Sequence, residues 1–92
     1  MAVLSPPEIE LRLKHIAGWS LQSGELVRTV QFPDFRAALR FVNSVGELAE
    51  MAGHHPDIDI RYNRVRLALV THDAGGITEK DLGLAGGINS LP

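Results

Sequence analysis

Apolar side chains recur with a helical period between residues 34 and 53, and shorter alternating runs lie on either side. In the helical stretch they fall at intervals of three, four and seven, which predicts an amphipathic helix with one buried face. Asp34 is placed to cap its start, and Gly53 to end it. Phe41 and Leu48 form a second apolar line, which fits either additional core or a subunit contact. The main buried face is predicted to hold Phe35, Ala38, Leu39, Val42, Val45, Ala49 and Ala52.

The residues before this helix predict a shorter helix and two strands. Residues 5–8, Ser-Pro-Pro-Glu, have the pattern of a capping box with proline in the first turn. An apolar face continues to Gly18, which is placed to end the helix, and His15 is interpreted as a surface residue on its polar side. Residues 19–22 and 25–32 then predict two strands joined by a tight turn.

Two further runs, residues 57–62 and 65–71, have the alternation of half-buried strands. Only residues 63–64, Asn-Arg, separate them, which predicts a two-residue hairpin turn because asparagine tolerates positive φ. Extending the register of that turn places His55 opposite His72. Directly opposed residues have Cβ atoms about 4.5–5.5 Å apart.

Three of the four histidines, His54, His55 and His72, are therefore predicted to lie close together. One interpretation makes them hydrogen-bonded structural residues. A second is a metal site, which only Glu50 or Asp73 could complete because the chain has no cysteine. The third is proton transfer, since an imidazole can donate or accept a proton near neutral pH.

The last part of the chain predicts one more helix. Thr78 and Asp81 have the spacing of a capping box, so Asp81 is expected to fix the helix start and to take no part in chemistry. Each glycine in a helix interior costs roughly 1 kcal/mol relative to alanine. A short or frayed helix is therefore predicted from Gly83, Gly86 and Gly87.

The order helix, strand, strand, helix, strand, strand, helix predicts one α+β domain over residues 1–92, with a four-stranded, mostly antiparallel sheet and its helices on one face. A net charge of −2 without a basic run argues against direct binding of nucleic acid. No signal peptide is evident, and no apolar stretch approaches the ~20 residues that span a bilayer. A cytoplasmic protein without membrane contact is therefore expected.

The residues around the histidines also follow a fixed spacing. Glu50 is followed after three residues by His54-His55-Pro56, after five more by Tyr62, after nine more by His72 and after eight more by Asp81. This pattern resembles the signature of the pterin-4a-carbinolamine dehydratases. The similarity covers about residues 6 to 88 and includes Gly18-Trp19, Phe32-Pro33-Asp34-Phe35 and Thr71-His72.

The resemblance implies dehydration of 4a-hydroxytetrahydropterin to quinonoid dihydropterin, by histidine acid–base catalysis without a metal or an organic cofactor. It implies that His54 and His72 exchange protons with substrate, in an order the sequence does not decide, while His55 holds or polarises the ring. Trp19 is either a core residue or a wall for the flat heterocycle. The other groups expected to bind the pterin are Glu50, Thr71, Asp73 and the backbone around Pro56.

The family also implies a homodimer or tetramer and a functional link to an aromatic amino acid hydroxylase through tetrahydropterin recycling. Two alternatives stay open: a pterin-binding or dimerisation-cofactor module for a transcription factor, and a role in molybdopterin metabolism. The chain departs from the family at Gly53, where relatives often carry Asp or Asn, and in its glycine-rich last helix. The first departure bears on substrate preference and the second on assembly.

Overall fold

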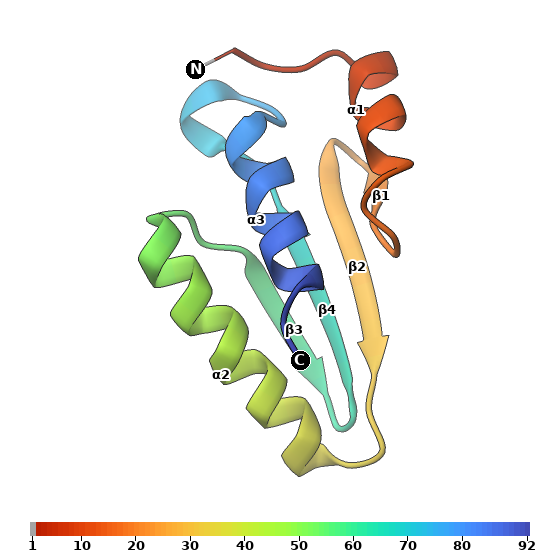
Figure 1. Ribbon diagram of the computed structural model, residues 1–92, viewed down its shortest axis with the longest axis vertical. Helices are drawn as coiled ribbons and strands as arrows, with labels where there is room; N and C mark the ends of the chain where they lie inside the picture. The colour runs from red at the N-terminus through yellow and green to blue at the C-terminus, as the bar shows by residue number, and fades with distance from the viewer. Residues whose placement is uncertain (1) are drawn as a thin grey trace.

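The computed structural model describes residues 2–92 and places three helices on one face of a four-stranded antiparallel sheet of order β1-β2-β4-β3 (Figure 1). The predicted α+β fold and element order are confirmed. Within residues 2–92, no helix has both the length and the apolar character needed to cross a membrane. The elements in order are α1 (Pro6–Leu13), β1 (Ser20–Gln22), β2 (Glu25–Gln31), α2 (Phe35–Ala52), β3 (Asp57–Arg61), β4 (Arg64–Leu69), the 3-10 helix η1 (His72–Ala74) and α3 (Glu79–Asn89).

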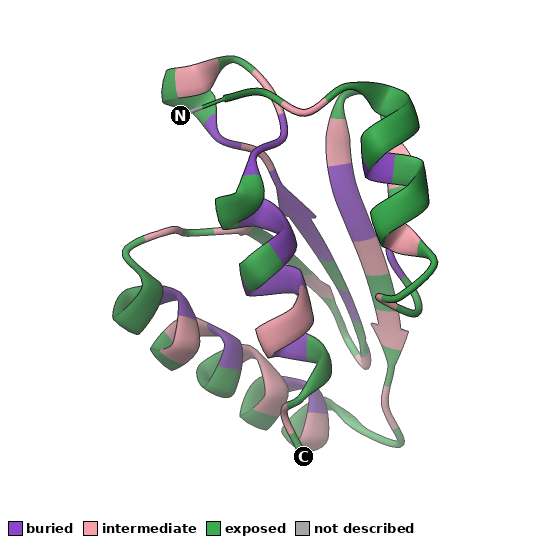
Figure 2. Cartoon of the chain, turned by 45° about the horizontal axis from the view of Figure 1, so that its top comes forward, coloured by how far each residue is buried: buried purple, intermediate pink, exposed green. Residues whose placement is uncertain are grey.

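The core lies between the sheet and the helices (Figure 2). Successive strand side chains point to opposite faces, so alternate residues of β2 and β4 face the helices. Leu26, Val65, Leu67 and Leu69 on that face are fully buried. Burial of one such side chain contributes about 1.5–3 kcal/mol, so the two central strands contribute strongly to the stability of the fold.

The turn between β3 and β4 lies one residue earlier than predicted. Arg61 pairs with Arg64, and the turn is formed by Tyr62, with φ 51°, and Asn63. Asn63 is held there because its side-chain Nδ2 donates to the Phe32 carbonyl at 2.8 Å, and its own carbonyl accepts from the Phe32 N–H at 2.8 Å. The predicted register, with residues 55 and 72 opposed, is therefore wrong.

The first helix is shorter than predicted and ends at Leu13. The N–H groups of Lys14, His15 and Ile16 donate to carbonyls three residues back, so the chain tightens out of the α-helix. Gly18, with φ 88°, belongs to the turn that leads into β1. The capping box at Ser5 and the exposed position of His15 are as predicted.

The α2 helix begins and ends at the predicted residues, but its buried face differs. Phe41 and Leu48 pack against the core, which makes the second apolar line part of the interior. Phe35 and Leu39 are 45% and 40% exposed instead. The Phe35 ring stacks on that of Tyr62 with centroids 6.5 Å apart, so an aromatic pair lies on the surface.

The α3 helix is not short or frayed: it runs for 11 residues and is tied to its neighbours. Gly87 explains part of the difference, because a Cβ there would lie 3.1 Å from Leu48 Cδ2, so glycine lets α3 approach α2 closely. At the helix start, two hydrogen bonds of 2.8 Å from the Arg12 guanidinium lower the pKa of the Glu79 carboxyl. The buried residues of α3 are Asp81, Leu82, Leu84, Ala85 and Ile88. Tertiary packing of α3 thus outweighs the low helix propensity of its glycines.

Candidate active site

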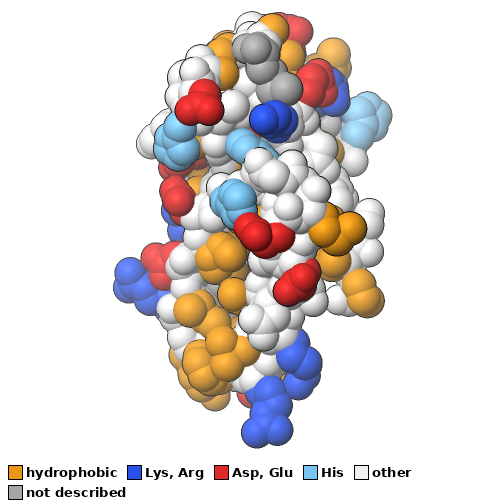
Figure 3. All heavy atoms as spheres, turned by 90° about the vertical axis from the view of Figure 1, so that its left-hand side faces the viewer, with side chains coloured by type: hydrophobic (Ala, Val, Ile, Leu, Met, Phe, Trp, Pro, Cys, Tyr) orange, Lys and Arg blue, Asp and Glu red, His pale blue; other side chains and the backbone are white. Residues whose placement is uncertain are grey.

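The three predicted histidines line one pocket of about 260 Å³. The pocket lies where α2 ends and where the chain leaves β4, and its lining residues are Gly53, His54, His55, Val70, Thr71, His72, Asp73 and Lys80. In Figure 3, histidine side chains lie beside acidic side chains on the upper half of one face of the molecule. The histidines meet there although the strand register differs from the predicted one.

The end of α2 sets the direction of the first two histidines. Gly53 has φ 63°, a left-handed conformation that favours glycine, and it turns the chain out of the helix. The N–H of His54 then donates to the Ala49 carbonyl at 3.2 Å. Adjacent side chains in the extended segment that follows point in different directions. The His54 side chain is 12% exposed, whereas that of His55 is 62% exposed.

His54 is backed by a buried carboxylate. Its Nε2 lies 2.6 Å from Oδ1 of Asp81, whose side chain is fully buried. Oδ2 of Asp81 accepts from the Thr71 hydroxyl at 2.7 Å and from the Thr78 N–H at 2.9 Å. Within residues 2–92 the buried polar and charged residues are these three, Thr71, Thr78 and Asp81, so the interior polarity of the fold is concentrated behind one histidine.

The hydrogen-bond chain has one consistent direction. The Thr71 hydroxyl has a single proton and donates it to Asp81, so the Thr78 hydroxyl, 2.8 Å away, donates to Thr71. The Thr78 oxygen in turn accepts from the Lys80 N–H at 3.3 Å. At neutral pH a carboxyl group is ordinarily ionised, and an ionised Asp81 makes Nε2–H of His54 the donor of the hydrogen bond to Oδ1. Nδ1 of His54 is then the ring nitrogen left to exchange a proton with a ligand.

The other two histidines have different surroundings. Nε2 of His55 contacts the carboxylate of Glu50, and both side chains are largely exposed. His72 begins η1 and is exposed, and no side chain of residues 2–92 hydrogen-bonds its ring. The three imidazoles of the pocket therefore differ. His54 contacts a buried carboxylate, His55 contacts an exposed carboxylate, and His72 contacts no carboxylate of residues 2–92.

Of the remaining predicted site residues, two line the pocket and three do not. Thr71 and Asp73 line the pocket, but the Thr71 hydroxyl is already committed to Asp81. Glu50 does not line the pocket but contacts His55, which does. Pro56 is half-buried and lies outside the pocket lining. Trp19 is not brought to the histidines: it is 5% exposed in the core, and its Nε1 donates to Asn89 at 2.9 Å.

Sequence reasoning missed two contributors, Asp81 and Lys80. Asp81 does cap α3 as predicted, but its second oxygen also holds His54, so a capping role and a site role are combined in one side chain. Its fixed spacing after the third histidine was the signal that could have identified it. Lys80 lies next to it on the exposed side of the helix start. Across residues 2–92, no group of three or more His, Cys, Asp or Glu is arranged to hold a metal ion.

Sequence comparison with known proteins gives one consistent result. The family model described as pterin 4 alpha carbinolamine dehydratase matches residues 2–91. A protein of Acidobacterium capsulatum named "Putative pterin-4-alpha-carbinolamine dehydratase" is 64% identical over 91 residues, which cover 99% of each chain. A protein of the same name from Chloroflexus aurantiacus is 58% identical over 91 residues, covering 99% of this chain and 98% of its own.

A solved structure has the same fold. The crystal structure of a transcriptional coactivator/pterin dehydratase from Brucella melitensis superimposes with a TM-score of 0.91 at 32% sequence identity. The superposition covers 97% of both chains. The similarity therefore extends over the helices, the sheet and the segments that carry the histidines.

Proposed function

Because the chain belongs to the pterin-4a-carbinolamine dehydratase family, a family of hydro-lyases, we propose that it dehydrates 4a-hydroxytetrahydropterin to quinonoid dihydropterin with His54 and His72 as the proton-transfer groups. The observation that carries the proposal is the meeting of His54, His55 and His72 in one pocket, with a buried carboxylate behind the first. The reaction needs an acid and a base close to the same bicyclic ring.

The chemistry balances with two proton transfers. The bond between C4a and the hydroxyl oxygen breaks with its electron pair on oxygen, and that oxygen takes a proton and leaves as water. N5 loses its proton, and the electron pair of that N–H bond forms the double bond between N5 and C4a. One group of the site gives a proton and another takes one, so the total number of protons on the protein is unchanged.

The surroundings of the histidines favour one assignment. His54 suits the base at N5, because the Asp81 carboxylate holds Nε2–H, leaves Nδ1 to accept, and stabilises the imidazolium that forms. His72 suits the acid at the leaving hydroxyl, because it has no carboxylate partner within residues 2–92 and lies at the solvent side, where it can regain its proton. The exposed pocket lets water return both rings to their starting states.

The remaining groups suit binding. His55 and Glu50 form an exposed pair that can hold or polarise the pterin ring, and Asp73 offers a carboxylate to its amino and amide edge. Thr71 acts through Asp81 as a positioning residue. Trp19 has no place in this proposal because its ring lies in the core. The reaction would serve recycling of the tetrahydropterin that an aromatic amino acid hydroxylase oxidises.

A titration with a stable reduced pterin, such as 7,8-dihydrobiopterin, tests where the substrate binds. We expect the imidazole C–H NMR signals of His54, His55 and His72 to move together with one dissociation constant. His15 is an internal control, since it is exposed beyond the end of α1 and lies outside the pocket. A pterin that leaves the three signals in place, or that moves His15 equally, would contradict the proposed site.

Assembly into a homodimer or tetramer is the second part of the proposal. Phe35, Leu39 and Tyr62 leave an apolar and aromatic surface on α2 and the β3–β4 turn, and Figure 3 shows hydrophobic side chains gathered on the lower half of that face. Light scattering should give a mass of at least two chains at micromolar concentration. Leu39→Asp should shift the mass toward one chain, whereas a monomeric wild-type chain would contradict the proposal.

A further inference from the structure

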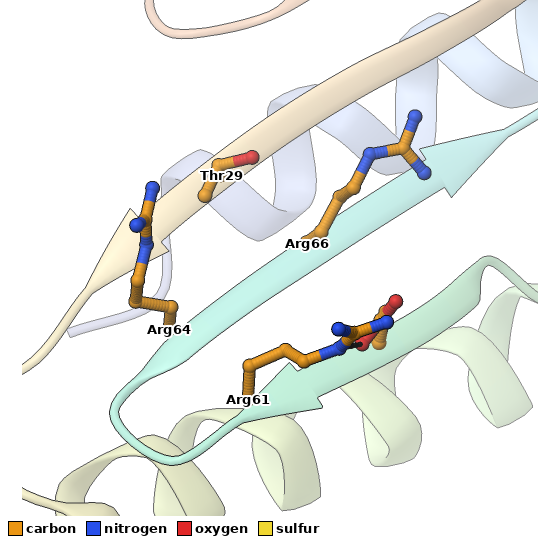
Figure 4. Close-up of a pocket in the computed structure, with 5 residues that line it drawn as sticks. Thr29, Arg61, Arg64 and Arg66 are labelled. Carbon is orange, nitrogen blue, oxygen red and sulfur yellow. Dashed lines mark hydrogen bonds and ion pairs between the residues drawn. The ribbon is translucent and has the colours of Figure 1, made fainter.

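The sheet face opposite the helices carries three arginines around a hollow of about 470 Å³, lined by Thr29, Asp59, Arg61, Arg64 and Arg66 (Figure 4). Val65 and Leu67 of β4 point into the core, and strand side chains alternate, so Arg64 and Arg66 point away from it. Figure 4 shows these two side chains extending on either side of Thr29, with the helices behind the sheet.

The pairing of these charges is unfavourable without a ligand. Arg61 and Arg64 are directly opposed across β3 and β4, and opposed like charges destabilise a strand pair. The one carboxylate of the hollow, Asp59, accepts from Arg61 Nε at 3.1 Å. Within residues 2–92, neither Arg64 nor Arg66 forms an ion pair or a side-chain hydrogen bond. Three guanidinium groups and one carboxylate leave a formal charge of +2 on a chain whose net charge is −2.

We propose that this hollow binds a phosphoryl dianion, with Arg64 and Arg66 as its principal ligands. A phosphate monoester carries a charge of about −1.5 to −2 at pH 7, which matches the local +2. The planar guanidinium fork matches phosphate oxygens in bidentate geometry. The Thr29 hydroxyl, on the strand next to both arginines, is a further donor.

The size and lining of the hollow favour a small ligand over a macromolecule. Its volume lies in the range of small-molecule sites. No aromatic or aliphatic side chain lines it, so it lacks the tryptophan and tyrosine anchors that accompany arginine at the centre of protein interfaces. It shares no residue with the histidine pocket. Binding of phosphate at this hollow is therefore independent of dehydration at the histidine pocket, and each can be tested without the other.

NMR titration of the uniformly ¹⁵N-labelled chain with inorganic phosphate and with phenyl phosphate tests the proposal. Signals of Thr29, Arg64 and Arg66 should shift saturably, and affinity should fall as ionic strength rises. Arg64→Gln and Arg66→Gln should each weaken binding about tenfold, which corresponds to the loss of one charge-assisted hydrogen bond. Equal affinity for the two probes identifies free phosphate as sufficient, and tighter binding of phenyl phosphate identifies an organic ester.

Two further variants make the result specific. Arg36→Gln is the matched control, because it removes an exposed arginine of α2 outside the hollow, and it should leave the affinity unchanged. Asp59→Asn should tighten binding, because it removes the one negative charge of the hollow and releases Arg61. Absence of saturable shifts, or an Arg64→Gln,Arg66→Gln double variant that binds like wild type, would overturn the proposal. Dehydration activity should be the same in all these variants.

Discussion

Replacing His72 with alanine should lower kcat/KM for dehydration of 4a-hydroxytetrahydropterin by about 10²–10⁴-fold, the usual contribution of one positioned acid or base. His72 is exposed at the start of η1, and none of residues 2–92 hydrogen-bonds its side chain, so its removal should leave the fold intact. Stopped-flow absorbance, which follows formation of the quinonoid product, measures the loss. His54→Ala should have an effect of similar size.

His15→Ala is the matched control for these variants. It removes the same side chain from an exposed turn outside the pocket, so kcat/KM should stay at the wild-type value. Because dehydration also occurs spontaneously, the uncatalysed rate must be subtracted. A His72→Ala variant that retains most of the catalysed rate would remove His72 from the proton transfer.

Asp81→Asn should lower the free energy of unfolding by about 3 kcal/mol and also slow dehydration, because one carboxylate serves both the helix cap and His54. The carboxylate accepts from His54, Thr71 and Thr78, whereas an amide has one acceptor oxygen and brings an NH₂ group against a donor. Urea unfolding followed by circular dichroism measures the first effect. The dehydration assay measures the second on the folded variant.

The chain contains its own control for this change, because α1 begins with a second capping box. Glu8 occupies the position in α1 that Asp81 occupies in α3, but it lies on the surface. Glu8→Gln should shift the urea midpoint much less than Asp81→Asn and leave kcat/KM unchanged. Equal shifts for both variants would mean that the buried hydrogen-bond chain behind His54 adds nothing beyond capping.

Local signals predicted most of the fold. Capping residues located the starts of all three helices, and Gly53 located the end of α2, because each acts on backbone groups a few residues away. Tertiary contacts decided the errors. The tether of Asn63 to Phe32 moved the β3–β4 turn by one residue, and close packing of Gly87 on α2 kept α3 regular.

The candidate site was predicted in part for a similar reason. Motif spacing identified the three histidines of the pocket even though the predicted register was wrong, since the end of α2 and the start of η1 position them. The partner of each ring could not be read from the sequence. Asp81 looked like an ordinary helix cap because its second hydrogen bond crosses 27 positions of sequence to His54. The sequence left Trp19 open between a core residue and a ligand wall, and its place in the core decides for the first.

The proposed reaction requires that His54 and His72 act on the same pterin ring. The initial rate of dehydration of 4a-hydroxytetrahydropterin, compared among wild type, each single alanine variant and the double variant, tests it directly. We predict a wild-type rate far above the spontaneous one, and a double variant that falls to the spontaneous rate. A wild-type chain no faster than buffer, or a double variant as fast as wild type, would contradict the claim.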